Sequence, residues 1–270
     1  MLTLRSETYH KIATLIHDAI GVSFSDSKLH LVSSRLGPRI QRLGLAGFED
    51  YLELIAGPQD AGEFQVAVDL LTTNETYFFR EPAHFDFLER EITATKPRTL
   101  AVWSAASSFG DEAYSTAMLL ADVQRRGYLG DAWSILGTDI SDRVLRSAVD
   151  AIYPLDRLRN VSPERRKRYC LRGEGGSDGL VQIHPDLRER VRFGRLNLCL
   201  PIENLGPFDV IFLRNVLIYF DADTKRAVVD RVLTQLRTGG LFFIGTAEGR
   251  AACDTPLKPL QPGVFRKCAA

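Results

Sequence analysis

The sequence predicts an α/β fold in which a mainly parallel β-sheet, covered by helices on both faces, follows an all-helical N-terminal domain. Three observations carry this prediction. The first ~70 residues show only helical periodicity, short apolar runs alternate with helical segments from about residue 98, and residues 156–195 interrupt that alternation with strand-like runs around a Gly-rich turn. We therefore expect a helical domain over residues 1–72 and an α/β domain over residues 73–270, with a small antiparallel β subdomain inserted at 156–195.

The composition is that of an ordinary soluble globular protein and excludes several classes of function. Hydrophobic residues make up 45% and charged residues 25% of the 270 residues, and 34 Lys and Arg balance 34 Asp and Glu. Because the net charge is zero, no global field favours nucleic acid. No stretch approaches the roughly 20 apolar residues that span a bilayer, and the N-terminus lacks a secretory signal, so we expect a cytoplasmic protein without membrane insertion. The four cysteines have neither CxxC spacing nor a nearby histidine pair, so no metal site is expected.

Four helices are expected in the N-terminal domain. Residues 7–20 repeat apolar residues at helical spacing, and a second helix begins near Asp26 and Ser27. The apolar stripe of this second helix comprises Leu29, Val32, Leu36, Ile40 and Leu43. Pro38 removes one hydrogen bond from the same helix, so we expect it to bend or break there. Two further helices are expected in "GFEDYLELI" and "EFQVAVDLLTT".

Strands and helices alternate through the C-terminal domain. The expected strands lie in "TLAVWSAA", "WSILGTDI", "FDVIFLRNVLIYF" and "GGLFFIGTAEG". The helices between them include "DEAYSTAMLLADVQRR", "SDRVLRSAVDAIY" and "DADTKRAVVDRVLTQL". Each strand is apolar on both faces, which is typical of a parallel sheet buried between two layers of helices. The closing "LKPLQPGVFRK" is expected to add a short hairpin to this sheet.

An open parallel sheet binds its ligand beyond the carboxyl ends of its strands. The loop after the first strand, "SAASSFGDEAY", lacks the GxGxxG pattern of dinucleotide sites. Asp111 and Glu112, at the start of the following helix, would repel a pyrophosphate but would suit an ammonium group. The alternative is that they are the acidic residues that ordinarily favour a helix start.

Asp139 ends the second strand, where a carboxylate can accept hydrogen bonds from both hydroxyls of a ribose. The alternative is that Asp139 caps the next helix, a role that Ser141 would fill equally well. Together these positions indicate a ligand with a ribose and an amino group and no phosphate. S-adenosylmethionine fits this description, whereas NAD and ATP fit it poorly.

Two other segments place polar side chains among apolar neighbours. Asn74, Thr76 and Arg80 lie around two phenylalanines in "TNETYFFREP", and Asn215 interrupts the apolar run "FLRNVLIYF". A polar group in such surroundings costs free energy unless a partner satisfies it. These residues are therefore further candidates for ligand binding.

The motifs "TNETYFFREP", "WSAASSFGDEAYS", "GTDIS", "NL" at 197–198, "FDVIFLRNVLIYF" and "GTAE" have an order and spacing that resemble the CheR-type chemotaxis receptor glutamate methyltransferases. The resemblance covers nearly the whole chain, including "SRLGPRIQRLG" in the helical domain. It implies a Rossmann-like methyltransferase fold that binds S-adenosyl-L-methionine and releases S-adenosyl-L-homocysteine. The cofactor residues that it implies are Asn74, Thr76, Arg80, Glu112, Asp139, Asn197, Leu198, Asn215 and Val216. Glu112 would hold the methionine amino group, and Asp139 the ribose.

The reaction that the resemblance implies is methyl ester formation on glutamate side chains. A glutamate, with a pKa of about 4.3, is already ionised at neutral pH, so no general base is required. We expect catalysis to depend on positioning, with Arg80 steering the acceptor carboxylate and Tyr219 lining the transfer site. The alternatives are core packing for Tyr219 and a surface ion pair for Arg80.

The expected partner is the cytoplasmic domain of a chemoreceptor, in an adaptation pathway, and the enzyme is expected to be a monomer. Lys28, Arg35, Arg39 and Arg42 fall on one face of the second helix and would dock an acidic receptor helix, the alternative being a solvated surface. The insertion resembles the β subdomain that in some family members captures a receptor's C-terminal pentapeptide by strand addition.

Two other functions remain open from the sequence. One is a methyltransferase of the same fold that acts on another protein or on a small molecule. The other is a non-catalytic module that binds S-adenosylmethionine in a signalling complex. The basic run "RNVSPERRKRY" is expected to be a solvated helix face, and nucleic acid is not expected as a partner.

Overall fold

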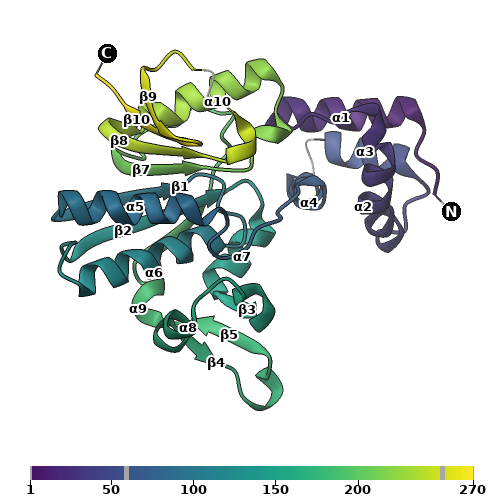
Figure 1. Cartoon of the computed structure of the whole chain (residues 1–270). Coiled ribbons are helices and arrows are strands. Elements are labelled where there is room, and N and C mark those ends of the chain that lie inside the picture. Colours follow the sequence, from purple (N-terminus) through teal and green to yellow (C-terminus); the bar gives the residue numbers. More distant parts are fainter. Residues whose placement is uncertain (1, 58–60, 250–252, 270) are drawn as a thin grey trace.

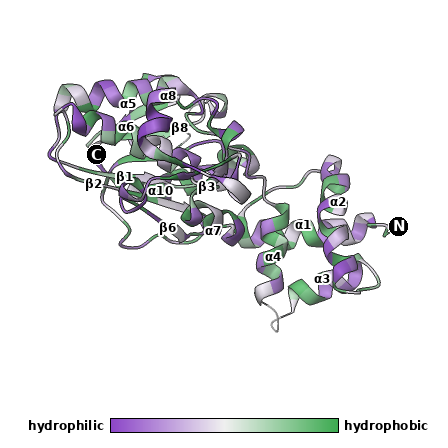
Figure 2. Cartoon of the chain, turned by 90° about the horizontal axis from the view of Figure 1, so that it is seen from below, coloured by the Kyte–Doolittle hydropathy of each residue, from purple (hydrophilic) through white to green (hydrophobic). Residues whose placement is uncertain are grey.

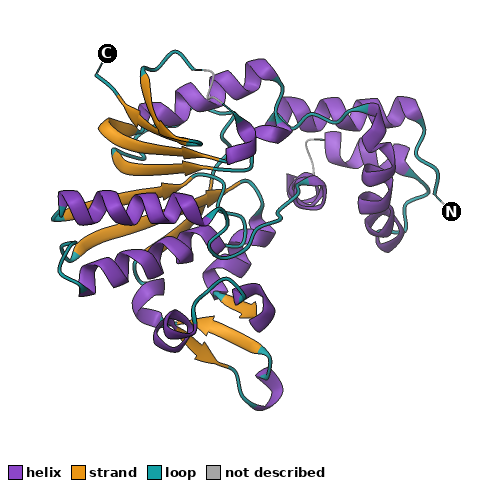
Figure 3. Cartoon of the chain, in the orientation of Figure 1, coloured by secondary structure: helices purple, strands orange, loops and turns teal. Residues whose placement is uncertain are grey.

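A computed structural model describes residues 2–57, 61–249 and 253–269. Figure 1 shows a helical N-terminal domain beside a layered α/β domain, with a small separate β-sheet at the far end of the latter. Figure 3 shows that helices lie on both sides of the main sheet. The expected fold class is confirmed. No helix in the described part of the chain is long and apolar enough to cross a membrane.

Within its described residues, 2–57 and 61–72, the N-terminal domain contains four α-helices and one 3₁₀ turn. They are α1 (Ser6–Ile20), η1 (Asp26–Lys28), α2 (Leu29–Arg42), α3 (Phe48–Ala56) and α4 (Ala61–Leu71). Figure 2 shows hydrophobic and hydrophilic residues alternating along these helices. Their apolar sides form one core that includes Tyr9, Ile12, Leu36, Ile40 and Tyr51. An amphipathic helix gains most of its stability from such packing.

The break expected at Pro38 is not found, because α2 runs without interruption from Leu29 to Arg42. Pro38 is exposed, so its ring does not disturb the core. Leu36 and Ile40, on either side of it, are fully buried. Packing of these two side chains holds the helix together despite the missing hydrogen bond.

The main sheet has seven strands in the order β6-β2-β1-β7-β8-β10-β9. They are β1 (Thr99–Ser104), β2 (Ala132–Asp139), β6 (Val191–Arg195), β7 (Phe208–Leu213), β8 (Leu236–Ile244), β9 (Leu257–Gln261) and β10 (Val264–Lys267). The first five strands in this order are parallel, and β10 and β9 add the expected antiparallel hairpin. The strand order reverses between β1 and β7, which is where an open sheet of this kind forms its ligand crevice.

Helices cover both faces of this sheet, as the apolar strands predicted. They are α5 (Pro82–Thr95), α6 (Asp111–Arg125), α7 (Asp142–Asp150) and α10 (Ala222–Thr234). Alternate residues of β7 separate to the two sides: Val210 and Phe212 join the core under α5 and α6, and Ile211 and Leu213 join the core under α10. This period of two is the side-chain alternation of a strand buried on both faces.

The insertion is a three-stranded antiparallel sheet in the order β3-β5-β4. Its elements are β3 (Ile152–Pro154), η2 (Leu155–Leu158), α8 (Pro163–Tyr169), β4 (Cys170–Arg172), η3 (Gly175–Ser177), β5 (Leu180–Ile183) and α9 (Pro185–Arg188). The expected range of 156–195 is wrong at both ends. The sheet already begins at β3, whereas β6 pairs in parallel with β2 and belongs to the main sheet. Both are short edge strands with partly exposed residues, so neither has the continuous apolar run of a central strand.

Asp122 of α6 joins this β subdomain to the main domain. Its carboxylate accepts hydrogen bonds from Arg165 Nε (2.8 Å), Arg168 Nη1 (2.9 Å) and the Tyr169 hydroxyl (2.7 Å), all on α8. Burial alone would raise the pKa of Asp122, but these bonds and the two guanidinium charges outweigh burial and lower the pKa below 3.8. The ionised carboxylate therefore stabilises the attachment of α8.

Replacing Asp122 with asparagine is expected to loosen α8, because the amide loses the negative charge that two arginines share. Limited trypsin digestion should then cut α8 faster than in the wild type, and Asp150→Asn, at an exposed position, should leave the rate unchanged. Since the folded pKa is lowered, the stabilisation is present above pH 3.8 and is lost as the pH falls through the folded pKa. Equal digestion rates for Asp122→Asn and the wild type would contradict this role.

Candidate active site

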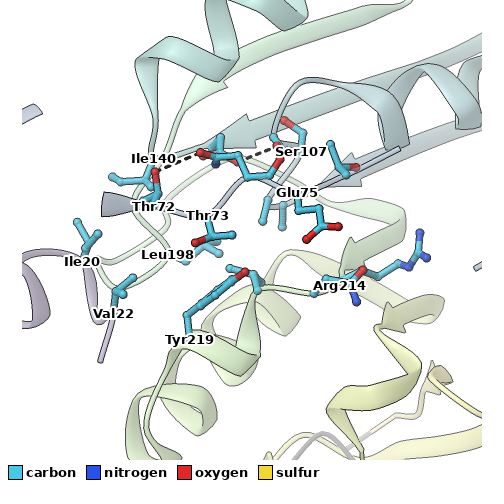
Figure 4. Close-up of a pocket in the computed structure, with 18 of the residues that line it drawn as sticks. Ile20, Val22, Thr72, Thr73, Glu75, Ser107, Ile140, Leu198, Arg214 and Tyr219 are labelled. Atoms are coloured by element: carbon cyan, nitrogen blue, oxygen red, sulfur yellow. Dashed lines mark hydrogen bonds between the residues drawn. The ribbon is translucent and has the colours of Figure 1, made fainter. Parts of the chain in front are cut away.

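A cavity of about 170 Å³ lies at the carboxyl ends of the parallel strands, at the point where the strand order reverses. Its walls come from the loops after β1, β2, β6 and β7, from residues 71–77 with Arg80, and from the helical domain. Figure 4 shows Tyr219 facing Thr73 across this space, with Ile20 and Val22 of the helical domain at one side. Both domains therefore build one pocket.

All of the residues expected to bind the cofactor or to act in transfer line this cavity. They are Asn74, Thr76, Arg80, Glu112, Asp139, Asn197, Leu198, Asn215, Val216 and Tyr219. They come from segments far apart in the sequence, so their convergence is a property of the fold. Of the four expected docking residues, only Lys28 also reaches the cavity.

Glu112, at the start of α6, is held by two hydrogen bonds. Ser104 Oγ donates to Oε1 (2.6 Å), and Arg214 Nη1 donates to Oε2 (2.8 Å). The carboxylate keeps further lone pairs for a ligand, because each oxygen can accept two hydrogen bonds. Its neighbour Asp111 is fully buried and forms a two-fold hydrogen-bonded ion pair with Arg157 instead (2.7 and 3.0 Å). Only one of the two acids at this helix start therefore faces the pocket.

Arg214, at the end of β7, is the main site residue that the sequence interpretation missed. Its side chain is 2% exposed and joins three segments. Its guanidinium donates hydrogen bonds to the Glu112 carboxylate and to the Arg80 carbonyl oxygen, and its Nη2 lies 3.5 Å from Glu81 Oε2. The rule that singled out Asn215, a polar residue within an apolar run, applies equally to Arg214.

Asp139, at the end of β2, accepts hydrogen bonds from two backbone amides. The N–H of Ser108 donates to Oδ2 (2.9 Å) and the N–H of Ser141 donates to Oδ1 (3.0 Å). Burial raises the pKa of Asp139 against the opposing effect of these bonds. Ser141, whose Oγ accepts from the N–H of Val144, is the residue that caps α7, so the capping alternative for Asp139 is wrong. Each carboxylate oxygen can still accept a ligand hydroxyl.

Two buried polar atoms beside these carboxylates have no hydrogen-bond partner among the described residues. They are Ser107 Oγ, in the loop after β1, and Arg214 Nε. Both residues line the cavity. An unpaired buried polar group costs about 1–3 kcal/mol, so the surroundings of these carboxylates are not optimised for stability alone. With lone pairs left on Glu112 and Asp139, the site fits a ligand that carries an amino group and a ribose.

Asn215 has a left-handed backbone conformation, and two carboxylates hold it in place. Its φ of 59° lies in the left-handed region. Glu248, in η5 (Thr246–Glu248), accepts from the backbone N–H of Asn215 (2.8 Å), Leu217 (2.7 Å) and Gly245 (2.7 Å). Glu81 accepts from Asn215 Nδ2 (3.3 Å). The partner of this asparagine is therefore Glu81, and the turn that leads into η4 (Leu217–Tyr219) is fixed by Glu248.

Replacing Glu248 with alanine is expected to release this turn and to lower the free energy of unfolding by about 1–3 kcal/mol, because three backbone amides lose their acceptor. Cofactor affinity should fall as well, since Asn215 and Val216 lie on the released turn. Chemical denaturation and calorimetric titration would measure the two effects. Glu248→Gln, which retains one carbonyl oxygen, should lose less of both, and a Glu248→Ala variant with wild-type stability would contradict this role.

Asn197 connects the two domains at the cavity wall. Its Nδ2 donates to the Ala19 carbonyl at the end of α1 (2.7 Å), and its Oδ1 accepts from the N–H of Cys199 (2.9 Å). Nearby, the N–H of Ser23 donates to the Tyr219 carbonyl (2.9 Å). These bonds fix the helical domain against the pocket. The adjacent Leu198 is buried and offers an apolar surface.

The segment after α4 carries the first group of expected residues. The Asn74 carbonyl accepts from Ser108 Oγ (3.0 Å), which ties this segment to the loop after β1. Arg80 Nη1 donates to the Glu75 carbonyl (2.9 Å). The alternative reading of Arg80, a surface ion pair, finds no carboxylate partner among the described residues, so the charge of Arg80 is available at the pocket.

The basic face of α2 is less free than the sequence suggested. Arg35 donates to the carbonyls of Leu71 and Thr72 (2.8 and 3.1 Å), and Arg39 makes a two-fold hydrogen-bonded pair with Glu63. Lys28 and Arg42 are exposed. Two of the four expected docking residues therefore have their donors engaged within the protein, although only Arg39 is paired with a carboxylate. Lys28 and Arg42 are the two that extend freely into solvent.

The comparisons with known proteins agree with this site. Residues 74–259 match the family model described as "CheR methyltransferase, SAM binding domain", and residues 7–72 match "CheR methyltransferase, all-alpha domain". A chemotaxis protein methyltransferase of Escherichia coli K12 is 39% identical over 248 residues, which cover 92% of this chain and 86% of the relative. Chemotaxis protein methyltransferase 2 of Pseudomonas aeruginosa is 37% identical over 90% of this chain and 86% of its own length. Chemotaxis protein methyltransferase 1 of Vibrio cholerae is 35% identical over 98% of both chains.

The expected recognition is confirmed by these matches, which together extend over both domains. The sequence motifs, the pocket at the switch point of the sheet and the family matches agree on one assignment. The chain belongs to the CheR methyltransferase family and is an S-adenosylmethionine-dependent methyltransferase.

Proposed function

We propose that this enzyme methylates glutamate side chains on the cytoplasmic helices of chemotaxis receptors and releases S-adenosyl-L-homocysteine. The relatives named above are chemotaxis protein methyltransferases. The observation that carries the proposal is the convergence of Glu112, Asp139, Arg80 and Tyr219 on one pocket shared by the two domains. We further propose that residues 1–72 form the receptor-docking domain and residues 73–270 the catalytic domain, in a monomer that works in the cytoplasm.

Each proposed cofactor contact follows from a group that the protein holds in place. Glu112 would accept from the methionine amino group, and Asp139 from the ribose hydroxyls. Asn197 and Leu198 would border the adenine, and Asn215 and Val216 the methionine end, with Asn74 and Thr76 on the opposite wall. When bound, the cofactor supplies an electrophilic methyl group on a positively charged sulfur.

The acceptor carboxylate needs orientation rather than activation, because glutamate is ionised at neutral pH. Arg80 uses one of its donors on the Glu75 carbonyl and keeps others for the acceptor carboxylate. Burial raises the pKa of Tyr219, so its hydroxyl stays protonated and can donate at the transfer site. We propose that these two residues position the carboxylate for in-line attack.

The β subdomain supports a second proposal about the partner, namely capture of a receptor's C-terminal pentapeptide. Strand β4 pairs only with β5, so its outer side is a free edge of the described sheet. An extended peptide can add to such an edge through backbone hydrogen bonds. Calorimetric titration with receptor tail peptides would test this, and the absence of heat with every tail would contradict it.

The direct test of the proposed function is transfer of labelled methyl groups to membranes rich in chemoreceptors. We expect label on the receptor that alkali releases, as a carboxyl methyl ester requires. Arg80→Ala should reduce the transfer rate. Label that resists alkali, or that appears only on a small molecule, would favour the other methyltransferase hypothesis. Cofactor binding without any transfer would favour a non-catalytic module.

A further inference from the structure

Two guanidinium groups lie against the ring of Tyr77 at the pocket wall. Arg80 Cζ lies 5.8 Å from the ring centroid, and Arg159 Cζ lies 5.6 Å from it. Tyr77 itself lines the cavity. Arg159 directly follows η2 in the β subdomain, so the ring brings together charges from two distant parts of the chain. Contact with an aromatic face orients a guanidinium without neutralising its charge.

A third arginine borders the same segment. Arg143 of α7 has its Nη2 3.3 Å from Asn74 Oδ1, and its Cζ lies 5.5 Å from the ring centroid of Phe109. Arg143 and Arg159 are exposed, and Arg80 is half-buried. We call Arg80, Arg143 and Arg159 the arginine rim, because each contacts the 74–80 segment that forms the wall of the pocket.

The members of the arginine rim have no ion-pair partner among the described residues, whereas neighbouring arginines do. Among the described residues, no carboxylate lies within ion-pair distance of any of its three members. By contrast, Arg157 beside it is paired with Asp111, and Arg39 on α2 is paired with Glu63. The acids near these arginines in the sequence include Glu75, Glu81, Asp142 and Asp156. Glu75 contacts Arg80 only through its backbone carbonyl, Glu81 lies 3.5 Å from Arg214, and Asp142 lies 3.7 Å from Arg195. Arg80 lines the cavity and Arg143 and Arg159 lie against its wall, and none of the three has an ion-pair partner among the described residues.

We propose that the arginine rim is a docking surface for acidic side chains next to the acceptor glutamate, on the receptor segment that enters the pocket. This inference rests on the proposed function, since it assumes a protein substrate that presents carboxylates. The planar fork of arginine matches a carboxylate with two parallel hydrogen bonds. Like-charged clusters at a site also steer an oppositely charged partner, and this effect weakens as salt is added. The arginine rim would add positive charge to the docking surface that Lys28 and Arg42 offer on the helical domain. Arg35 and Arg39 contribute less to that surface, because their donors bind within the protein.

The test uses Arg159→Glu and the double variant Arg143→Glu/Arg159→Glu in the full-length enzyme, and leaves Arg80 intact because of its proposed role in transfer. The substrate is a soluble cytoplasmic fragment of a chemoreceptor, methylated with labelled cofactor. At low salt we expect kcat/KM for the fragment to fall about tenfold in the double variant, because KM rises. As salt is added, the difference between the double variant and the wild type should shrink. Affinity for S-adenosyl-L-homocysteine and the value of kcat should change less than twofold.

Lys258→Glu provides the matched control for Arg159→Glu, because it makes the same charge change as that single variant at an exposed position on β9. An equal loss in Lys258→Glu would mean that only net charge matters and would overturn the proposal. Wild-type kcat/KM in both arginine variants at low salt would also overturn it while leaving the proposed function intact. If the wild-type enzyme itself labels no receptor fragment, the proposed function fails, and the docking role fails with it.

Discussion

Replacing Arg214 with methionine is expected to abolish measurable cofactor binding and to lower the free energy of unfolding by about 3–5 kcal/mol. The reason is that the side chain of Arg214 is 2% exposed and is the shared partner of Glu112 and Glu81. Without it, the largely buried carboxylates of Glu112 and Glu81 would both lose the arginine that neutralises them. Chemical denaturation would measure the stability, and calorimetric titration with S-adenosyl-L-homocysteine would measure the binding.

Two further variants separate the causes of this loss. Arg237→Met removes a similar pair with Asp209 (2.6 Å), but Arg237 is 56% exposed, so its loss should be below about 1 kcal/mol. In the double variant Arg214→Met/Glu112→Gln, part of the stability should return, because one unpaired charge is gone, while cofactor binding should not. If Arg214→Met were as stable as Arg237→Met, the ion pairs of Arg214 with Glu112 and Glu81 would not be needed for the stability of the fold.

Replacing Asp139 with asparagine is expected to weaken binding of S-adenosyl-L-homocysteine by about ten- to a hundredfold, because hydrogen bonds to a charged group contribute about 1.5–3 kcal/mol. Asparagine has nearly the same shape, but it has only one acceptor oxygen. Both carboxylate oxygens of Asp139 accept a backbone N–H, from Ser108 and Ser141. The amide nitrogen would therefore meet one of these donors, which should also displace the loop after β1.

The control for this variant is Asp142→Asn, three residues further along, whose carboxylate lies 3.7 Å from Arg195 and does not line the cavity. It should bind the ligand as the wild type does. Calorimetric titration of both variants would measure the difference. Equal affinity in Asp139→Asn and the wild type would exclude a ribose contact at this position.

The sequence was sufficient to predict the layered fold because its central strands are apolar on both faces. In β7, Val210 and Phe212 pack under one helix layer and Ile211 and Leu213 under the other. The expected pocket residues were found for a related reason. Asn215 and Asp139 are polar positions at the ends of such strands, where the topology brings their side chains together.

What the sequence could not predict depends on contacts between distant segments. The pairing of Arg39 with Glu63 removes a charge from α2 that helical spacing alone leaves exposed. Likewise, the edge strands β3 and β6 take their places from their partners rather than from their own apolar pattern. Arg214 is a different case, because it lies next to Asn215 in the same apolar run and the same reasoning would have identified it.

A crystal structure of the enzyme with S-adenosyl-L-homocysteine tests the central claim most directly, namely that the crevice between β1 and β7 receives the methyl donor. The account predicts the ligand's amino group on Glu112, its ribose hydroxyls on Asp139 and its sulfur towards Tyr219 and Arg80. A ligand bound elsewhere, or one in this crevice that touches neither carboxylate, would contradict it.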